Sequence, residues 1–240
     1  MARKQAKVEN RDEIPVTLDH HPFYGFDLDS DQTIFRDSIW DTKKKIIFCD
    51  AKAGSGKTFV SFATANLLYE YGLYDGIIYV VSPYGEQKQG FLPGSITEKS
   101  EVYFEPIYQA IVKCGLFPMR VIYDDSMVSG NVEYKGSGYV KCITHTYLRG
   151  TNFENKVIIL DETQNYNFSD LKKTLTRIND NCKVIIIGHT QQKDTYDTTD
   201  AFQRYIRYYG SMNDDRVAIC KLTKNYRGWI SQTADELEFR

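Results

Sequence analysis

The segment 47–58 constrains this chain most, because an apolar run ends there in a short glycine-rich turn. It reads IFCDAKAGSGKT, and its second half has the spacing of a phosphate-binding loop whose Lys57-Thr58 pair opens a helix. Backbone N–H groups of residues 53–58 are expected to surround phosphates, assisted by the positive end of the helix dipole. The segment therefore predicts a strand, a P-loop and a helix that together bind a nucleoside triphosphate with Mg²⁺.

Within this loop, Lys57 is expected to reach the β- and γ-phosphates as a point charge, and the Thr58 hydroxyl to ligate Mg²⁺. Ala51 departs from the usual pattern, which has glycine there, and alanine is disfavoured at positive φ. The alternative interpretation is an ordinary strand-to-helix turn with a solvated lysine. The nucleotide-binding residues predicted in the loop are Ala53, Gly54, Ser55, Gly56, Lys57 and Thr58.

Apolar runs of strand length recur along the chain and are mostly continuous, which is typical of strands buried on both faces of a parallel sheet. Helical stretches are expected between them, at Thr58–Tyr71, about 97–113, Ser169–Ile178 with Ser169 as N-cap, and about 200–209. This alternation predicts a doubly wound α/β fold with a mainly parallel sheet flanked by helices. The predicted strands are Ile46–Cys49, Ile77–Val81, Val157–Leu160, Lys183–Ile187 and Val217–Leu222.

The chain of 240 residues suits one α/β domain with short appendages. We expect an extended N-terminal arm over 1–30, a single ATPase domain over 31–230 and a tail over 231–240. Within the domain, residues 120–148 contain short β-like runs separated by glycines. They predict a small inserted antiparallel β-hairpin.

Composition limits the surface charge and the cellular compartment that we expect for this chain. The formal net charge is −2, which argues against a surface that is basic overall but leaves room for a local basic groove. The odd count of 5 cysteines without a C-x-x-C pair suits a reducing compartment. There is no secretory signal and no apolar span of about 20 residues. We therefore expect a soluble, cytoplasmic protein with no structural zinc and no membrane partner.

A second nucleotide signal lies about 100 residues after the loop, where an apolar run ends in the pair Asp161-Glu162. At such a strand end the first acid holds Mg²⁺, and the second polarises the attacking water, because catalysis of this kind depends on positioning and electrostatics. Alone, the pair is equally consistent with a solvated strand end. With the P-loop, it predicts Asp161 as metal ligand and Glu162 as general base.

A third apolar run ends in the polar segment 188–191. Gln191 is a candidate for sensing the γ-phosphate or orienting the attacking water. The alternative is a loop amide bonded to nearby backbone.

These ordered blocks resemble the PhoH family of P-loop ATPases, which are similar to the motor core of superfamily-1 helicases. The resemblance implies a P-loop NTPase (RecA-like) fold. Residues 51–58 match the family's G-P-A-G-T-G-K-T, and residues 160–165 (LDETQN) match its L-D-E-A-Q-N. The most specific match is GFLPGSITEK at 90–99, because generic P-loop proteins have no reason to carry it. Further matches are RGT at 149–151, LTR at 175–177 and GHTQQKD at 188–194.

The resemblance implies roles for further residues. Gln32 would bond the adenine edge, since its amide offers both a donor and an acceptor, and Arg227 would reach the γ-phosphate. Arg177 and Arg149 are rival candidates for that arginine, in cis or from a neighbouring subunit. His189 departs from the family's usual aspartate, and a neutral histidine cannot replace that charge.

The resemblance also implies an ATPase that couples hydrolysis to single-stranded nucleic acid, RNA favoured, with Mg²⁺ as cofactor. A chain of this length has room for one motor lobe, so self-assembly into a homo-oligomer is implied. Tyr205, Tyr208 and Tyr209 either stack on bases or pack within the protein. The alternative function, motivated by Ala51 and His189, is a nucleotide-gated binding module with little turnover. A kinase is a weaker alternative, because the pattern around the acid pair favours water activation.

Overall fold

The computed structural model describes residues 14–82, 102–123, 138–145, 153–190 and 201–235. Within these ranges the strands form one sheet of six, all parallel, in the order β3-β2-β4-β5-β1-β6. The P-loop strand β1 lies inside the sheet, between β5 and β6. The strands are β1 (Ile46–Ala51), β2 (Ile77–Val81), β3 (Val140–Thr144), β4 (Val157–Asp161), β5 (Lys183–Gly188) and β6 (Val217–Leu222).

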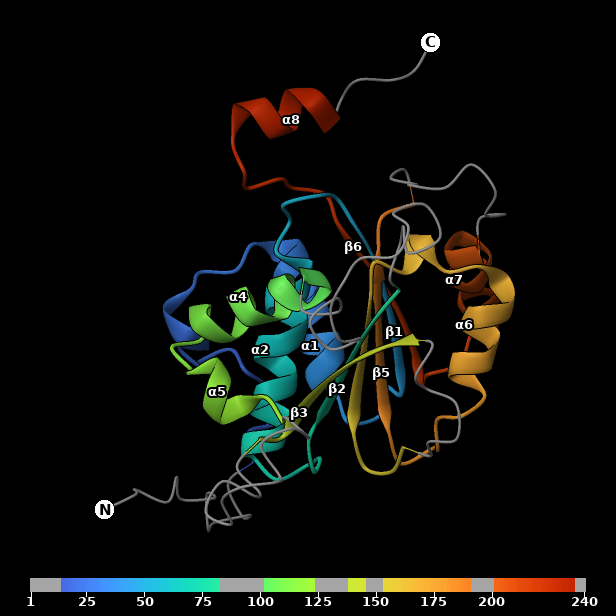
Figure 1. The fold of residues 1–240 in the computed structure, drawn as a ribbon, viewed down its shortest axis with the longest axis horizontal. Coiled ribbons are helices and arrows are strands. Elements are labelled where there is room, and N and C mark those ends of the chain that lie inside the picture. The colour runs from blue at the N-terminus through green and yellow to red at the C-terminus, as the bar shows by residue number, and fades with distance from the viewer. Residues whose placement is uncertain (1–13, 83–101, 124–137, 146–152, 191–200, 236–240) are drawn as a thin grey trace, which may run out of the picture.

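Helices cover both faces of the sheet (Figure 1). One group, α1, α2 and α4, lies on one face, and α6 and α7 lie on the other, while α8 extends beyond the layers. No helix in the described ranges is long and apolar enough to cross a bilayer. The helices are α1 (Ser30–Trp40), α2 (Lys57–Glu70), α4 (Glu105–Lys113), α5 (Pro118–Val121), α6 (Phe168–Leu175), α7 (Ala201–Ser211) and α8 (Trp229–Asp235), with 3-10 turns at Phe23–Gly25, Val102–Phe104 and Thr163–Asn165.

The continuous apolar strands supply two separate cores, because side chains alternate between the faces of a strand. In β4, Ile159 points into the core beneath α1, α2 and α4, whereas Ile158 and Leu160 point into the core beneath α6 and α7. All three side chains are fully buried. Strands with two buried faces need an apolar residue at nearly every position, so the sequence pattern is continuous.

The five strands predicted from the sequence are confirmed, each within two residues of its expected end. The helix predicted at Ser169 begins one residue earlier, at Phe168. Asn167 caps it, because its side-chain oxygen accepts the Asp170 N–H at 2.9 Å. Asparagine and serine are both strong N-cap residues, so the sequence did not distinguish the neighbouring positions.

The predicted antiparallel hairpin over 120–148 is wrong where the structure describes it. Residues Val140–Thr144 form β3, an edge strand that pairs in parallel with β2. Val121 ends α5, and Ile122 forms an isolated parallel bridge with Val140. Short β-branched runs between glycines fit an edge strand and a hairpin equally well, so local pattern could not choose between them. Another β-like run of that predicted hairpin, at 132–134, lies outside the described ranges.

The residues expected to form an extended N-terminal arm pack against the domain from residue 15 onward. Leu18 and Phe23 are buried in the core beneath α1 and α2. The Trp40 indole donates a hydrogen bond to the Pro15 carbonyl at 3.0 Å. The described part of this segment is therefore a structural part of the domain.

A buried lysine joins the start of β5 to the loop before β1. Lys183 has no exposed surface, and its Nζ donates to the carbonyls of Asp41 at 2.7 Å and Lys44 at 2.6 Å. Burial lowers its pKa to about 7. A neutral amine still has the N–H groups that these two carbonyls accept.

We expect Lys183→Met to lower the free energy of unfolding by about 1–3 kcal/mol, because the two carbonyls lose a buried donor. The pKa of Lys183 rises from about 7 in the folded chain to its ordinary value near 10.5 on unfolding. The unfolded chain therefore binds the extra proton between these values, and stability rises with pH across that window. Urea denaturation at pH 7 and pH 9 should show wild type gaining stability relative to the variant; equal changes in both would contradict this.

Candidate nucleotide-binding site

The P-loop connects the carboxyl end of β1 to α2, and its glycines adopt the backbone conformation that the turn requires. Gly54 has φ 69° and Gly56 has φ 82°, values that favour glycine. Ala51 instead ends β1, is fully buried and pairs with Leu222. It is not among the described residues with positive φ. The alanine that departs from the motif therefore occupies its position without backbone strain.

The start of α2 has the features of a phosphate site. Its N-cap, Gly56, has no side chain to cap the helix, so the first backbone N–H groups remain available to an anion. Ser55 is only 1% exposed, and its hydroxyl has no hydrogen-bond partner in the described part of the chain. A buried hydroxyl without a partner is unfavourable unless a ligand supplies one. The loop therefore fits the phosphates of a nucleotide.

Asp161, the last residue of β4, lies directly against the P-loop helix. It shares the sheet face of Ile159, which is the α2 side. Its carboxylate accepts hydrogen bonds from the Thr58 hydroxyl at 2.8 Å and the Tyr79 hydroxyl at 2.7 Å. The backbone N–H of Glu162 donates to it at 2.7 Å. The two predicted metal ligands, Thr58 and Asp161, are thus brought together.

Burial raises the pKa of Asp161, the neighbouring Glu162 raises it further, and Lys57 partly offsets both. A fully buried carboxylate is stabilised in its charged form by a cation. Carboxylate and hydroxyl oxygens are the donors that Mg²⁺ prefers. The donor set therefore fits Mg²⁺ held by Thr58 and Asp161.

Glu162 adopts a left-handed conformation, with φ 50°. Non-glycine residues in this region cost about 1–3 kcal/mol and often occur at functional sites. Glu162 Oε1 lies 3.4 Å from Lys57 Nζ. Its other oxygen accepts a hydrogen bond from the Gln164 amide at 2.5 Å, and the Gln164 oxygen accepts the His189 N–H at 3.1 Å. The predicted base is thereby linked to the P-loop and to the end of β5.

The segment directly after β5 is hydrogen-bonded to Asp50, the residue before the P-loop. Asp50 accepts hydrogen bonds from the Thr190 N–H and hydroxyl, both at 3.0 Å. His189 is 4% exposed, and its Nδ1 has no partner among the described residues. Gln191, predicted to face the γ-phosphate, lies outside the described residues, as does the 90–99 block.

The segment after β6 crosses the P-loop at Gly54. The Tyr226 N–H donates to the Gly54 carbonyl at 2.9 Å. A Cβ added to Gly54 would lie 2.6 Å from Asn225 Oδ1 and 2.7 Å from Arg227 Cγ. The structure therefore brings the predicted Arg227 to the P-loop.

Of the two rival candidates, Arg149 lies outside the described residues, and Arg177 lies away from the P-loop. It follows α6, directly before Ile178, which bridges to Phe153 ahead of the start of β4. The P-loop and Asp161 stand at the opposite, carboxyl end of these strands. Arg177 does not line the cavity beside the P-loop.

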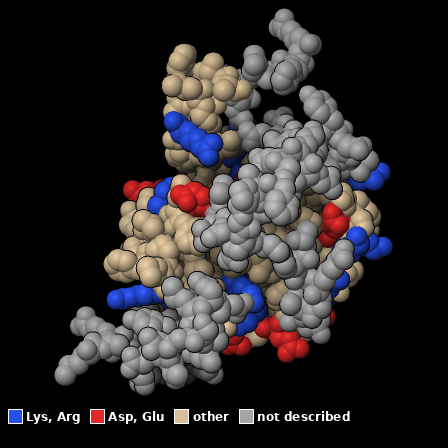
Figure 2. Space-filling view, in the orientation of Figure 1, with Lys and Arg blue, Asp and Glu red and all other residues tan. Residues whose placement is uncertain are grey.

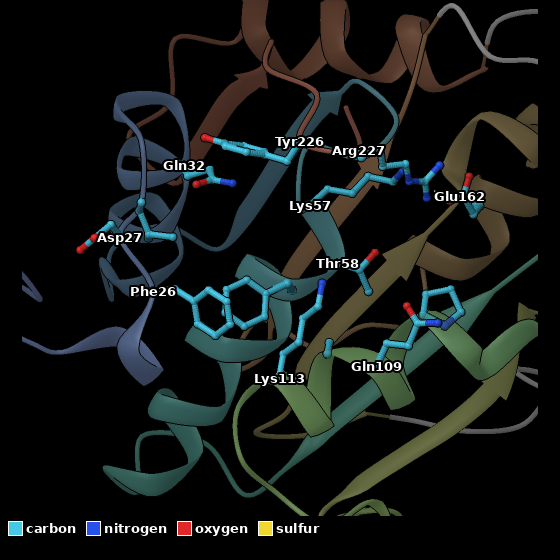
Figure 3. A pocket seen from close by; sticks show the side chains of 16 residues that line it. Phe26, Asp27, Gln32, Lys57, Thr58, Gln109, Lys113, Glu162, Tyr226 and Arg227 are labelled. Atoms are coloured by element: carbon cyan, nitrogen blue, oxygen red, sulfur yellow. Dashed lines mark ion pairs between the residues drawn. The ribbon is translucent and has the colours of Figure 1, made fainter. Parts of the chain in front are cut away.

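The P-loop opens into a cavity of about 490 Å³, a volume typical of ligand sites. Figure 3 shows Lys57, Arg227 and Glu162 together at one end of it. Phe26 and Tyr226 lie toward the other end, and Gln109 and Lys113 project from α4. The cavity thus has a charged end and an aromatic end.

Gly54→Ala is expected to weaken nucleotide binding about tenfold or more, because the methyl group must displace Asn225 and Arg227. Gly72→Ala is a matched control: Gly72 has φ 71°, but a Cβ there meets nothing within 4 Å. Both variants carry the same backbone strain, and the control should bind nucleotide normally. Titration calorimetry with an ATP analogue measures the difference; equal affinities would contradict the close packing at Gly54.

Sequence reasoning missed several residues of this site. Tyr79 lies in the middle of an apolar strand, where a tyrosine suggests only core packing. Asp50 directly precedes the P-loop, and a charged residue directly after the apolar run 46–49 was a usable signal. Phe26 lies in the segment expected to be an arm, and Tyr226 directly precedes Arg227 but had no predicted role.

The parallel sheet, the glycine loop entering α2, and the buried Asp161 against Thr58 together define a P-loop NTPase domain. The family model described as "PhoH-like protein" matches residues 28–234. The chain therefore belongs to the PhoH family.

Curated relatives agree. The chain is 33% identical to Protein PhoH of Escherichia coli (strain K12) over 195 residues, which cover 75% of this chain and 52% of that protein. It is 31% identical over 150 residues to a PhoH-like protein of Mycobacterium leprae, covering 62% and 40% of the two chains. Protein PhoH2 of Bacillus subtilis is 29% identical over 194 residues, covering 78% and 41%. The chain spans about half the length of these relatives or less.

Among solved structures, the HK97 bacteriophage large terminase is similar with a TM-score of 0.49 at 14% identity, covering 87% of this chain and 42% of that one. The Sulfolobus solfataricus SWI2/SNF2 ATPase core has a TM-score of 0.47 at 11% identity, covering 83% and 45%.

Proposed function

We propose that this chain hydrolyses ATP and couples hydrolysis to single-stranded nucleic acid, with RNA as the favoured partner. One observation carries the catalytic part: two pairs of side chains from the P-loop helix and the end of β4 converge. Thr58 Oγ1 lies 2.8 Å from Asp161 Oδ2, and Lys57 Nζ lies 3.4 Å from Glu162 Oε1. These are the groups that phosphoryl transfer to water needs.

Mg²⁺, held by Thr58 and Asp161, would supply neutralisation of charge on the phosphate oxygens. Lys57 and the N–H groups at the start of α2 bind and orient the phosphates. Glu162 takes a proton from the attacking water. Lys57 Nζ lies 3.4 Å from Glu162 Oε1, and phosphates bound by the loop would compete with this carboxylate for the lysine and leave the carboxylate free to act on water. Arg227 stabilises the charge that develops in the transition state.

The nucleic-acid part rests on family membership more than on the described surface. On the face shown in Figure 2, Lys and Arg side chains lie in several separate places with Asp and Glu near them. On α7, Tyr205 is 9% exposed and packs beside Phe168, with ring centroids 5.2 Å apart. Packing therefore accounts for Tyr205. Tyr208, which is 64% exposed, stays a candidate for stacking on a base.

Phosphate release should be measured with Mg²⁺ and ATP, with and without single-stranded RNA or DNA. We expect release that rises on adding RNA. No release under any condition would contradict the ATPase; release unaffected by either nucleic acid would contradict only the coupling. Solution mass measured in the same samples tests the proposed homo-oligomer.

His189 favours a second candidate, a nucleotide-gated binding module with little turnover. Its side chain is buried, and its backbone N–H donates to Gln164, which in turn bonds Glu162. The family usually has an acidic residue at this position. This candidate predicts tight ATP binding with negligible phosphate release. His189→Asp should then raise the rate of release, and an unchanged rate would count against it. Ala51 no longer supports this candidate, because it lies in β1 without strain.

A further inference from the structure

The end of the cavity away from the charged residues is built from aromatic rings. Phe26 and Phe59 are in contact, with centroids 4.7 Å apart at an interplanar angle of 57°. Tyr226 is 47% exposed and lines the same cavity (Figure 3). Since the P-loop fixes the phosphate end, the base of a bound nucleotide lies toward these rings. Every base has a π-face, so stacking of this kind is tolerant of base identity.

The amide of Gln32, the residue expected to read adenine, is already engaged within the protein. Its oxygen accepts the Asp29 N–H at 3.2 Å as part of the capping box of α1. Its nitrogen donates to the Ser55 carbonyl at 2.8 Å. The side chain is 7% exposed and lies so close to Gly56 that a Cβ there would be 3.1 Å from Gln32 Nε2. The amide therefore holds the P-loop against the start of α1.

The other polar groups near the rings are committed or point away. The Tyr226 hydroxyl donates to Asp29 Oδ2 at 2.5 Å, and Asp29 Oδ1 accepts the Gln32 N–H at 2.8 Å. In Figure 3 the carboxylate of Asp27 points away from the cavity. Lys113 projects toward the cavity, but an ammonium only donates, and every base offers an acceptor. Among the described side chains near Phe26 and Tyr226, none thus presents a free donor–acceptor pair. The Gln109 amide donates to Glu105 Oε1 at 3.0 Å and projects from α4 in another part of the cavity (Figure 3).

We infer that the chain binds nucleoside triphosphates without selecting the base, and that Gln32 is a positioning residue for the P-loop. The inference rests on the proposed nucleotide site. A site that hydrogen-bonds a specific edge rejects analogues by about 10⁴–10⁵, whereas an apolar pocket discriminates by only about 10–200-fold. The end of the cavity formed by Phe26 and Tyr226 is an apolar site of the weakly discriminating kind.

The test is titration calorimetry with the β,γ-imido analogues of ATP, GTP, CTP and UTP, each with Mg²⁺. We expect four dissociation constants within about tenfold of one another, purines binding more tightly because their rings stack over more area. An ATP analogue bound more than about 200-fold tighter than the GTP analogue would overturn the inference. Failure to bind any analogue would remove the nucleotide site itself, and with it the proposed function.

Variants distinguish a Gln32 that positions the P-loop from a Gln32 that recognises the adenine base. Gln32→Ala should weaken all four analogues by a common factor of about 2–10, the effect of one hydrogen bond at the Ser55 carbonyl. A loss confined to the ATP analogue would overturn the inference. Tyr226→Ala should weaken all four by about 5–100-fold, whereas Tyr226→Phe keeps the ring and should bind nearly as wild type. Unchanged affinities in Tyr226→Ala would contradict the stacking role.

Discussion

Glu162→Gln should lower the rate of phosphate release by about 10²–10⁴-fold, the usual contribution of a general base, with nucleotide affinity nearly unchanged. Glutamine keeps the shape of the side chain and can still contact Gln164, but it cannot accept a proton from water. The substitution also removes the anionic partner of Lys57, so the lysine remains free for the phosphates. Single-turnover phosphate release and analogue binding, measured on the same preparation, separate the two effects.

A control for this variant is Glu154→Gln, since Glu154 is exposed ahead of the start of β4, at the opposite end of that strand from Glu162, and contacts only Asn179 in the bonds described for it. It should hydrolyse ATP at the wild-type rate. Hydrolysis by Glu162→Gln at the wild-type rate would rule out Glu162 as the general base, and a strongly reduced affinity would assign it a binding role instead.

Lys57→Ala should reduce kcat/KM by at least about 100-fold, as does the loss of one preorganised charge at a reacting oxygen. Here both affinity and turnover should fall, because the Lys57 ammonium contacts the phosphates before and during the reaction. Its side chain is only 12% exposed, so its charge acts in a poorly solvated environment. The two variants should therefore differ in nucleotide affinity, which Lys57→Ala loses and Glu162→Gln retains.

Lys43→Ala provides the matched control, because Lys43 is exposed in the loop between α1 and β1. Both variants remove one lysine from the chain, so a general effect of net charge would appear in both. Unchanged hydrolysis in Lys57→Ala would exclude the P-loop assignment. Thermal unfolding of each variant checks that the domain is intact.

The sequence predicted the phosphate and acid elements of this site because their chemistry is local. Lys57 and Thr58 follow a strand at fixed spacing, and the pair Asp161-Glu162 ends another strand. The carboxyl ends of parallel strands meet at one edge of a sheet. Local pattern and sheet topology were therefore enough to bring these residues together, and the structure has Thr58 in contact with Asp161.

The aromatic end of the cavity could not be predicted from local pattern and sheet topology, because it depends on contacts between segments that are distant in the sequence. Phe26 comes from the segment before α1, Phe59 from α2 and Tyr226 from the segment after β6. Nothing in the local sequence around Phe26 separates a cavity-lining ring from a buried one. The same limit explains Val140–Thr144, whose partner strand β2 is decided by tertiary packing.

The segment after β6 has a consequence for how the protein is made. Tyr226 bonds the Gly54 carbonyl, and Thr223 bonds Asp31 at the start of α1. During synthesis the P-loop and α1 leave the ribosome long before these partners. A nascent chain that has already folded β1 and α2 therefore lacks one wall of its nucleotide cavity. We therefore expect the nascent domain to bind nucleotide, and to gain the stability that binding provides, only after residue 227 has emerged from the ribosome.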